Sequence, residues 1–197
     1  MPTLLNVGAG SRLKEVPPHY AGWEHLRLDI DPDCGADVVC DARLLGERLP
    51  SASYDAIYCS HNLEHYFPHD GERVLRGFAH VLKPDGFAEI RVPDIGEVLR
   101  AAVSRGLDLE DELYASPAGP IRVLDVVYGW QEEIARSGQE FYGHRTGFTA
   151  KSLARALSRA GFGVVFLVPP MAIYELRALA FRITPTDAQR ALLGIGR

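Results

Sequence analysis

The chain has 197 residues, of which 47% are hydrophobic and 24% charged, and its formal net charge is -5. This length and composition predict one globular domain over residues 1–197, with a core that needs no disulfides or structural metals. The negative charge argues against a nucleic-acid substrate, and no apolar run approaches the ~20 residues of a membrane span. With no secretory signal and no Cys-x-x-Cys spacing, we expect a cytoplasmic protein with reduced thiols.

A glycine turn follows the first apolar run of the chain. Leu4 to Val7 is typical of a buried parallel strand, and Gly8-Ala9-Gly10 then predicts a tight turn that a ligand approaches closely. Such a turn is typical of a nucleotide-binding site. A dinucleotide site would have a third glycine where the chain has Leu13, so a hydride-transfer enzyme is a distant alternative.

Two aspartates follow the next predicted strands. Asp29 lies at the end of a strand over Trp23 to Ile30, 19 positions after Gly10, close to the ~20 residues at which an acidic side chain meets a nucleotide ribose. A carboxylate can accept two hydrogen bonds from a diol. Asp41 follows a short strand over Ala36 to Cys40, where its carboxylate could accept from an adenine amino group.

Strands alternate with helical patterns along most of the chain, which predicts a parallel sheet. The expected strands are Ser53 to Cys59 and Phe87 to Val92, and the expected helices are Ser11 to Val16, Asp70 to Leu82, Asp94 to Arg105, Thr149 to Ala160 and one starting near Thr186. A turn at Pro169-Pro170 joins Gly163–Val168 to Ile173–Phe181, so these two strands are expected to be antiparallel.

Residues 96–147 form a long insertion between two predicted elements. The insertion has an acidic cluster, a break at Pro117-Ala118-Gly119-Pro120 and an aromatic stretch that includes Tyr128 and Trp130. Insertions of this length in compact domains are usually binding loops or lids. We therefore expect a helical lid over the substrate, with Tyr128 and Trp130 packing inside it.

The order and spacing of these motifs resemble those of the class I S-adenosylmethionine-dependent methyltransferases. The resemblance depends on Leu4 to Gly10, Leu28 to Pro32, Asp41-Ala42, Tyr54 to Ile57, Leu82 to Gly86 and Leu157 to Phe162. More narrowly, Ser60 to His65 (Ser-His-x-Leu-Glu-His) and Tyr142 to Phe148 (Tyr-Gly-His-x-Thr-Gly-Phe) resemble a group of small bacterial, type-11-like members.

The resemblance implies an α/β, Rossmann-like methyltransferase fold: a seven-stranded, mostly parallel sheet with an antiparallel last strand and helices on both faces. It implies S-adenosyl-L-methionine as cofactor. The methionine part would lie over Gly8, Ala9 and Gly10, the ribose on Asp29, the adenine near Ile30, Asp41 and Ala42, and the sulfonium before Ser60 and His61. Many members have an acidic residue where this chain has Asn6, which can still bond the cofactor's amino group but brings no charge.

Three histidines are the candidates for acid–base chemistry. Methyl transfer is an in-line displacement, so most of the catalysis can come from positioning the acceptor and excluding water. If the acceptor loses a proton, a histidine suits neutral pH. The candidate catalytic residues are His61, His65 and His144, although His65 could simply bond backbone and His144 could pin the lid.

Other functions stay open at this stage. His61-Asn62-Leu63-Glu64-His65 matches the His-x-x-Glu-His signature of zinc peptidases, but that chemistry needs a stable helix, which Pro68 would interrupt. A zinc hydrolase using His61, Glu64 and His65 is therefore a distant alternative, no metal is expected, and Glu64 is expected to anchor an amide or Arg145. A non-catalytic protein that binds S-adenosylmethionine or S-adenosylhomocysteine is a nearer alternative to the methyltransferase.

The acceptor is the least defined part of the expected reaction. The acidic charge and compact lid favour a small molecule, and the resemblance is to a group often linked to sugar metabolism, although no residue specifies a sugar. The apolar run from Leu176 to Phe181 would permit a homodimer as well as a monomer.

Overall fold

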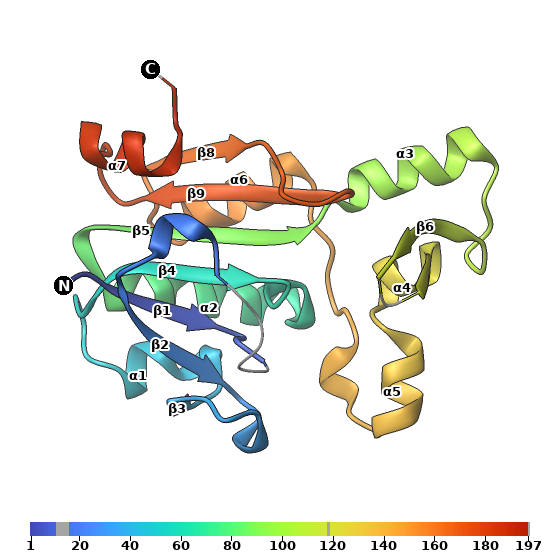
Figure 1. Cartoon of the computed structure of the whole chain (residues 1–197), viewed down its shortest axis with the longest axis horizontal. Helices are drawn as coiled ribbons and strands as arrows, with labels where there is room; N and C mark the ends of the chain where they lie inside the picture. The colour runs from blue at the N-terminus through green and yellow to red at the C-terminus, as the bar shows by residue number, and fades with distance from the viewer. Residues whose placement is uncertain (11–15, 118, 197) are drawn as a thin grey trace.

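The computed structural model describes residues 1–10, 16–117 and 119–196 (Figure 1). The expected helix from Ser11 falls almost entirely outside the described residues, as does Leu13 at the third-glycine position. Among the helices that are described, none has the length and apolar character needed to cross a membrane.

A seven-stranded sheet in the order β3-β2-β1-β4-β5-β9-β8 forms the centre of the described structure. Its strands are β1 (Thr3–Val7), β2 (Glu24–Asp29), β3 (Val38–Val39), β4 (Tyr54–Ser60), β5 (Leu82–Pro93), β8 (Val164–Val168) and β9 (Glu175–Phe181). The first five are parallel to one another, and β9 runs antiparallel between β5 and β8. The predicted fold class, with its antiparallel last strand, is confirmed.

β5 is longer than the sequence predicts. The strand was expected to begin at Phe87, after a turn at Lys83 to Gly86, but it begins at Leu82. Leu82 pairs with Tyr54, and the register of the two strands shifts between Tyr54 and Ala56. An irregular pairing of this kind extends a strand through turn-forming residues, which a local pattern does not indicate.

Helical segments cover both faces of the sheet (Figure 1). One face packs against α1 (Leu45–Arg48), α2 (Pro68–Val81) and α6 (Ala150–Arg159), and the other against the 3-10 turn η1 (Pro18–Tyr20) and α7 (Asp187–Leu193). The apolar stripe of α2, which includes Val74 and Phe78, is fully buried against the strands. Thr149 caps α6 and Thr186 caps α7, close to the predicted starts.

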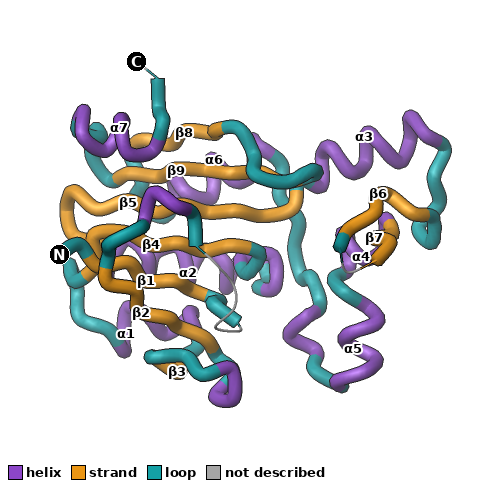
Figure 2. The backbone as a smooth tube through the Cα atoms, in the orientation of Figure 1, coloured by secondary structure: helices purple, strands orange, loops and turns teal. Residues whose placement is uncertain are grey.

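The insertion lies beyond the carboxyl ends of β4 and β5 (Figures 1 and 2). It consists of α3 (Ile95–Arg105), β6 (Glu112–Ser116), β7 (Gly119–Arg122), α4 (Val123–Tyr128), α5 (Gln131–Ser137) and the 3-10 turn η5 (Glu140–Tyr142). The insertion is therefore not purely helical, because β6 and β7 form an antiparallel hairpin. Residues of α3, β6 and α4 form a small core of their own.

Candidate active site

The glycine turn after β1 takes a conformation that requires glycine. Gly8 and Gly10 have φ angles of +68° and +56°, in the left-handed region. The Gly8 amide donates to the Leu28 carbonyl oxygen at 2.9 Å, which fixes the turn to β2. A Cβ on Gly8 would lie 2.6 Å from the Asn62 Cβ. Both the backbone and the packing therefore exclude a side chain at Gly8.

Asp29 connects this turn to the end of β2. Its Oδ2 accepts from the Gly10 amide at 2.8 Å, and its Oδ1 accepts from the Asp31 amide at 3.1 Å. The Arg27 guanidinium also donates to the Gly10 carbonyl oxygen. Since each carboxylate oxygen has two lone pairs, both oxygens of Asp29 keep capacity to accept from a ligand hydroxyl.

A cavity of about 290 Å³, called here the first cavity, opens beside the turn. Seven of the sequence-predicted site residues line it: Gly8, Gly10, Asp29, Ile30, Asp41, His61 and His65. Asn6, Ala9, Ala42 and Ser60 are buried and are not among the lining residues. The sequence did not single out the cavity residues Cys34, Arg43, Tyr66, Phe67, Asp70 and Phe141, which carry no motif signal.

Asp41 lies in the first cavity but already has a partner. The Arg43 guanidinium donates to Asp41 Oδ2 through Nε at 2.9 Å and Nη2 at 2.6 Å. Burial raises the pKa of this carboxyl, but the hydrogen bonds from Arg43 outweigh burial and lower the pKa below its usual value. Asp41 is therefore ionised at neutral pH, and an adenine amino group would have to share it with Arg43.

His61 occupies the boundary between the sheet and the insertion, with a left-handed φ of +50° that is unusual outside glycine. Its Nε2 lies 3.1 Å from Glu175 Oε2, and its Nδ1 lies 3.5 Å from Glu64 Oε1. Burial lowers the pKa of His61, but the two carboxylates outweigh burial and raise it to about 9. A histidine that is protonated at neutral pH cannot accept a proton, so this geometry argues against the predicted general-base role of His61.

Glu175 is the centre of the ion pairs behind His61. Arg91 donates to Glu175 Oε2 through Nη2 at 2.6 Å and Nε at 2.9 Å, and the Met171 amide donates to Oε1 at 3.0 Å. Burial raises the pKa of Glu175, yet hydrogen bonds from His61 and Arg91 outweigh burial and lower the pKa to about 2. The side chain is 1% exposed, so its charge is stabilised by these partners rather than by water.

We expect this carboxylate to make the fold acid-sensitive. The pKa of Glu175 is about 2 in the folded chain and about 4.3 when unfolded, so its contribution to stability is present above the unfolded value and is lost as pH falls from about 4.3 towards 2. We expect Glu175→Gln to be less stable than the wild type at pH 6 and to lose less stability between pH 6 and pH 3. Urea unfolding at the two pH values measures both effects; equal losses in the two proteins would contradict this assignment.

A second cavity of about 310 Å³ lies under the insertion, and His61 lines it as well as the first cavity. Its other lining residues are Pro93, Tyr114, Ile121, Asp125, Val126, Trp130, His144, Ala172, Ile173 and Tyr174. Trp130 is 47% exposed and faces this cavity, whereas the sequence favoured packing inside the insertion. The predicted histidines are thus divided, with His65 on the first cavity and His144 on the second.

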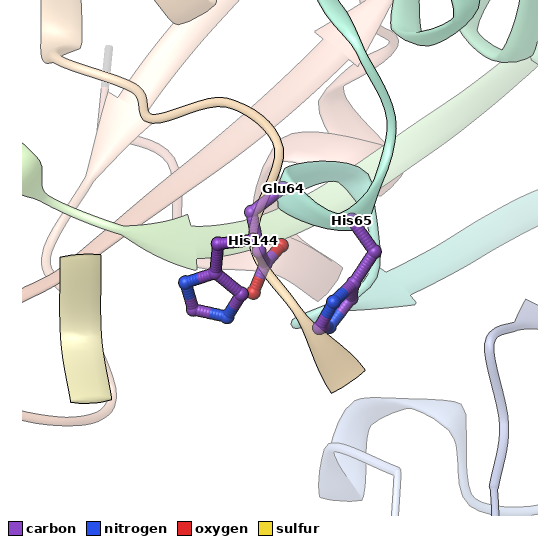
Figure 3. Close-up of side chains that lie close together, drawn as sticks. All are labelled: Glu64, His65 and His144. Carbon is purple, nitrogen blue, oxygen red and sulfur yellow. The ribbon is translucent and has the colours of Figure 1, made fainter. Parts of the chain in front are cut away.

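The segment 143–148 returns from the insertion past Glu64 (Figure 3). His65 Nδ1 donates to the Gly143 carbonyl oxygen at 3.1 Å, and His144 Nδ1 donates to the Val126 carbonyl oxygen at 2.9 Å. Glu64 was expected to anchor an amide or Arg145, and its backbone oxygen accepts from the amides of Arg145 and Thr146.

The His-x-x-Glu-His segment does not form a zinc-peptidase helix. In the described chain it contains a single 3-10 turn, η4 (Leu63–His65), and α2 begins at Pro68. His61 contacts Glu175, whereas His65 contacts the Gly143 carbonyl oxygen. The two histidines therefore lack the shared helix face that the peptidase chemistry requires.

The sheet order, the glycine turn after β1 and the acidic residue ending β2 together define a class I methyltransferase fold. A family model described as a methyltransferase domain matches residues 4–167. The chain belongs to this family, and its resemblance to the class I S-adenosylmethionine-dependent methyltransferases is confirmed.

Solved structures share the fold at low sequence identity. A SAM-dependent methyltransferase of Archaeoglobus fulgidus is 14% identical with a TM-score of 0.54, over 91% of this chain and 85% of that chain. The 1,6-didemethyltoxoflavin-N1-methyltransferase of Burkholderia thailandensis, solved with S-adenosylhomocysteine, is 22% identical with a TM-score of 0.52, over 91% of this chain and 70% of that chain. A protein of Pyrococcus horikoshii is 14% identical with a TM-score of 0.58, over 91% of this chain and 81% of that chain. No curated protein matches the sequence significantly.

Proposed function

We propose that this methyltransferase binds S-adenosyl-L-methionine in the first cavity and transfers its methyl group to a small molecule in the second. The observation that carries the proposal is the meeting of the two cavities at His61. A donor and an acceptor on either side of one residue can be held within the short distance that an in-line displacement needs. Cavities of about 290 and 310 Å³ suit small ligands rather than a polymer.

The cofactor would lie along the carboxyl ends of β1, β2 and β3. We assign its methionine part to the turn Gly8-Ala9-Gly10, with Asn6 and Ser60 beneath it, and its ribose hydroxyls to the Asp29 carboxylate. Its adenine would lie between Ile30 and the Asp41–Arg43 pair, while Ala42, predicted as a contact, is buried and does not line this cavity. The left-handed glycines and the remaining acceptor capacity of Asp29 support this orientation.

His61 is a positioning group in this scheme. Its imidazolium is held by Glu64 and Glu175 on opposite sides, so it keeps the junction of the cavities rigid and does not take a proton. The sulfonium methyl is already electrophilic, and alignment with exclusion of water supplies most of the required catalysis. His65 and His144 keep Nε2 available, since their Nδ1 atoms are used by backbone carbonyls.

Residues 96–147 would act as the cover of the acceptor. The lining contributed by this insertion is largely aromatic and aliphatic, with Tyr114, Ile121 and Trp130. The ring of Tyr174, which also lines the cavity, packs against that of Tyr114 at 5.7 Å between centroids. Asp125 and His144 add polar groups to this wall. Such a lining fits a small metabolite with one flat or apolar face and a polar substituent, a description that a sugar also meets.

A screen for turnover tests the proposed reaction. Wild-type protein is incubated with methyl-labelled S-adenosylmethionine and a panel of small hydroxylated and amino acceptors, and labelled product and S-adenosylhomocysteine are measured together. We expect equal amounts of both with at least one acceptor class. Tight binding of the cofactor without labelled product across the panel would instead favour a non-catalytic binding protein.

Two exposed aromatic residues of the insertion make a matched pair of variants. Phe141 lines the first cavity and Trp130 the second. We expect Phe141→Ala to weaken S-adenosylhomocysteine binding by about 10-fold, and Trp130→Ala to raise the KM of the acceptor by about 10-fold with little change in cofactor affinity. Calorimetry and initial-rate kinetics separate the two effects. If both variants change the same constant, the assignment of one ligand to each cavity is wrong.

A further inference from the structure

Three chemically suitable side chains converge where the insertion meets the sheet. Glu64, His65 and His144 each offer one donor atom, and these atoms all lie within 4.8 Å of one another (Figure 3). Glu64 and His65 come from the turn after β4, and His144 comes from the segment that returns from the insertion. The group thus joins two parts of the chain that are far apart in sequence.

Both imidazoles are oriented as metal ligands usually are. A carbonyl oxygen accepts only, so the bonds from His65 to Gly143 and from His144 to Val126 require a proton on each Nδ1. In the neutral ring, Nε2 then carries the lone pair. Histidines that bind metals commonly donate their other N–H to a backbone carbonyl in this way, which fixes the ring and its tautomer.

The carboxylate between the rings lacks the hydrogen bonds that its burial calls for. Glu64 is 1% exposed, and neither of its carboxylate oxygens has a hydrogen-bond partner in the described part of the chain. His61 approaches one oxygen at 3.5 Å, but that imidazole makes its shorter contact, 3.1 Å, with Glu175. The His61 imidazolium offsets part of the cost of this buried charge but makes no hydrogen bond to Glu64, and a bound cation would compensate for the rest.

We propose that Glu64, His65 and His144 bind a divalent transition-metal ion of the zinc type. Two imidazoles and one carboxylate suit such an ion better than Mg²⁺ or Ca²⁺, which prefer oxygen ligands. Around a tetrahedral ion with bonds of ~2.1 Å, ligand atoms lie about 3.4 Å apart. The ligand atoms here lie within 4.8 Å of one another, so they would approach one another by up to about 1.4 Å when an ion binds.

The position of the three residues indicates what the ion would do in the reaction. His65 lines the first cavity and His144 the second, so the ion lies at the wall between them. Three protein ligands leave at least one coordination position open. That position takes a hydroxyl or carboxylate oxygen of the acceptor, which would orient the acceptor with respect to the donor. This task depends on the proposed function, whereas the metal site itself does not.

Calorimetric titration of metal-stripped protein with Zn²⁺ tests the site. We expect one ion per chain in the wild type and a dissociation constant raised by about 100-fold or more in each of His65→Ala, His144→Ala and Glu64→Gln. His69→Ala is the matched control, because His69 has a 79% exposed side chain and lies four residues from His65. This variant should bind Zn²⁺ as the wild type does.

Absorption of bound Co²⁺ gives a second measurement on the same proteins. The visible bands of low-coordinate Co²⁺ should appear in the wild type and in His69→Ala and be lost in His144→Ala, with thermal unfolding showing that each variant is folded. Zn²⁺ binding that is unchanged in both His65→Ala and His144→Ala, or absent from the wild type, would overturn the proposal. S-adenosylhomocysteine titration of the same samples reports separately on the methyltransferase function.

Discussion

Substituting Asp29 with alanine should weaken S-adenosylhomocysteine binding by about 100-fold, equivalent to ~2.8 kcal/mol. Two effects combine in this loss. The ribose hydroxyls would lose a charged acceptor, and hydrogen bonds to charged groups contribute about 1.5–3 kcal/mol. The turn would also loosen, because Asp29 Oδ2 accepts from the Gly10 amide at 2.8 Å.

Asp37→Ala is the matched control for this measurement. Asp37 also accepts from a backbone amide of β2, that of Arg27 at 2.8 Å, but it does not line the first cavity. The control should leave the dissociation constant within about twofold of the wild type. Equal weakening in the two variants would mean that general loosening of β2, and not a ribose contact, explains the effect of Asp29.

Gly8→Ala should abolish measurable S-adenosylhomocysteine binding and lower the free energy of unfolding by about 3 kcal/mol. The new Cβ would lie 2.4–2.6 Å from three side-chain atoms of Asn62, far inside van der Waals contact. Relief requires that Asn62 or the turn move, and overpacking of this kind typically costs 1–3 kcal/mol. The left-handed φ of +68° adds ~1 kcal/mol for a residue with a Cβ. Denaturant unfolding and calorimetry measure the two results.

The Gly22→Ala variant separates the effect of backbone strain from that of the steric clash expected in Gly8→Ala. Gly22 has a φ of +81°, and a Cβ added there would meet nothing within 4 Å. Its alanine variant should lose about 1 kcal/mol of stability and bind S-adenosylhomocysteine normally. If Gly8→Ala is no more damaging than Gly22→Ala, close packing at the glycine turn is not what shapes the first cavity.

The parts of the fold that depend on local chemistry could be predicted from the sequence. The buried run before Gly8, the stripe of α2 and the caps at Thr149 and Thr186 each act within a few residues. The acidic ends of β2 and β3 fall at one edge of the sheet because parallel strands bring their carboxyl ends together.

The remaining features depend on contacts between distant residues. The hairpin of β6 and β7 was missed because neither strand has a strong alternating pattern, and β5 is extended by irregular pairing with β4. His61 was predicted as a catalytic histidine, but its raised pKa results from Glu175, which is 114 positions away, together with Glu64. Likewise, no local signal brings His144 to Glu64 and His65; the return segment does so through tertiary hydrogen bonds.

Calorimetric titration of S-adenosylhomocysteine into the wild-type protein tests the central claim most directly, because the product occupies the same cavity as the donor without being consumed. We expect one site per chain and a micromolar dissociation constant, about -8 kcal/mol in binding free energy. A folded wild-type protein that releases no heat, and whose thermal unfolding is unchanged at saturating ligand, would contradict the assignment of the first cavity to the cofactor.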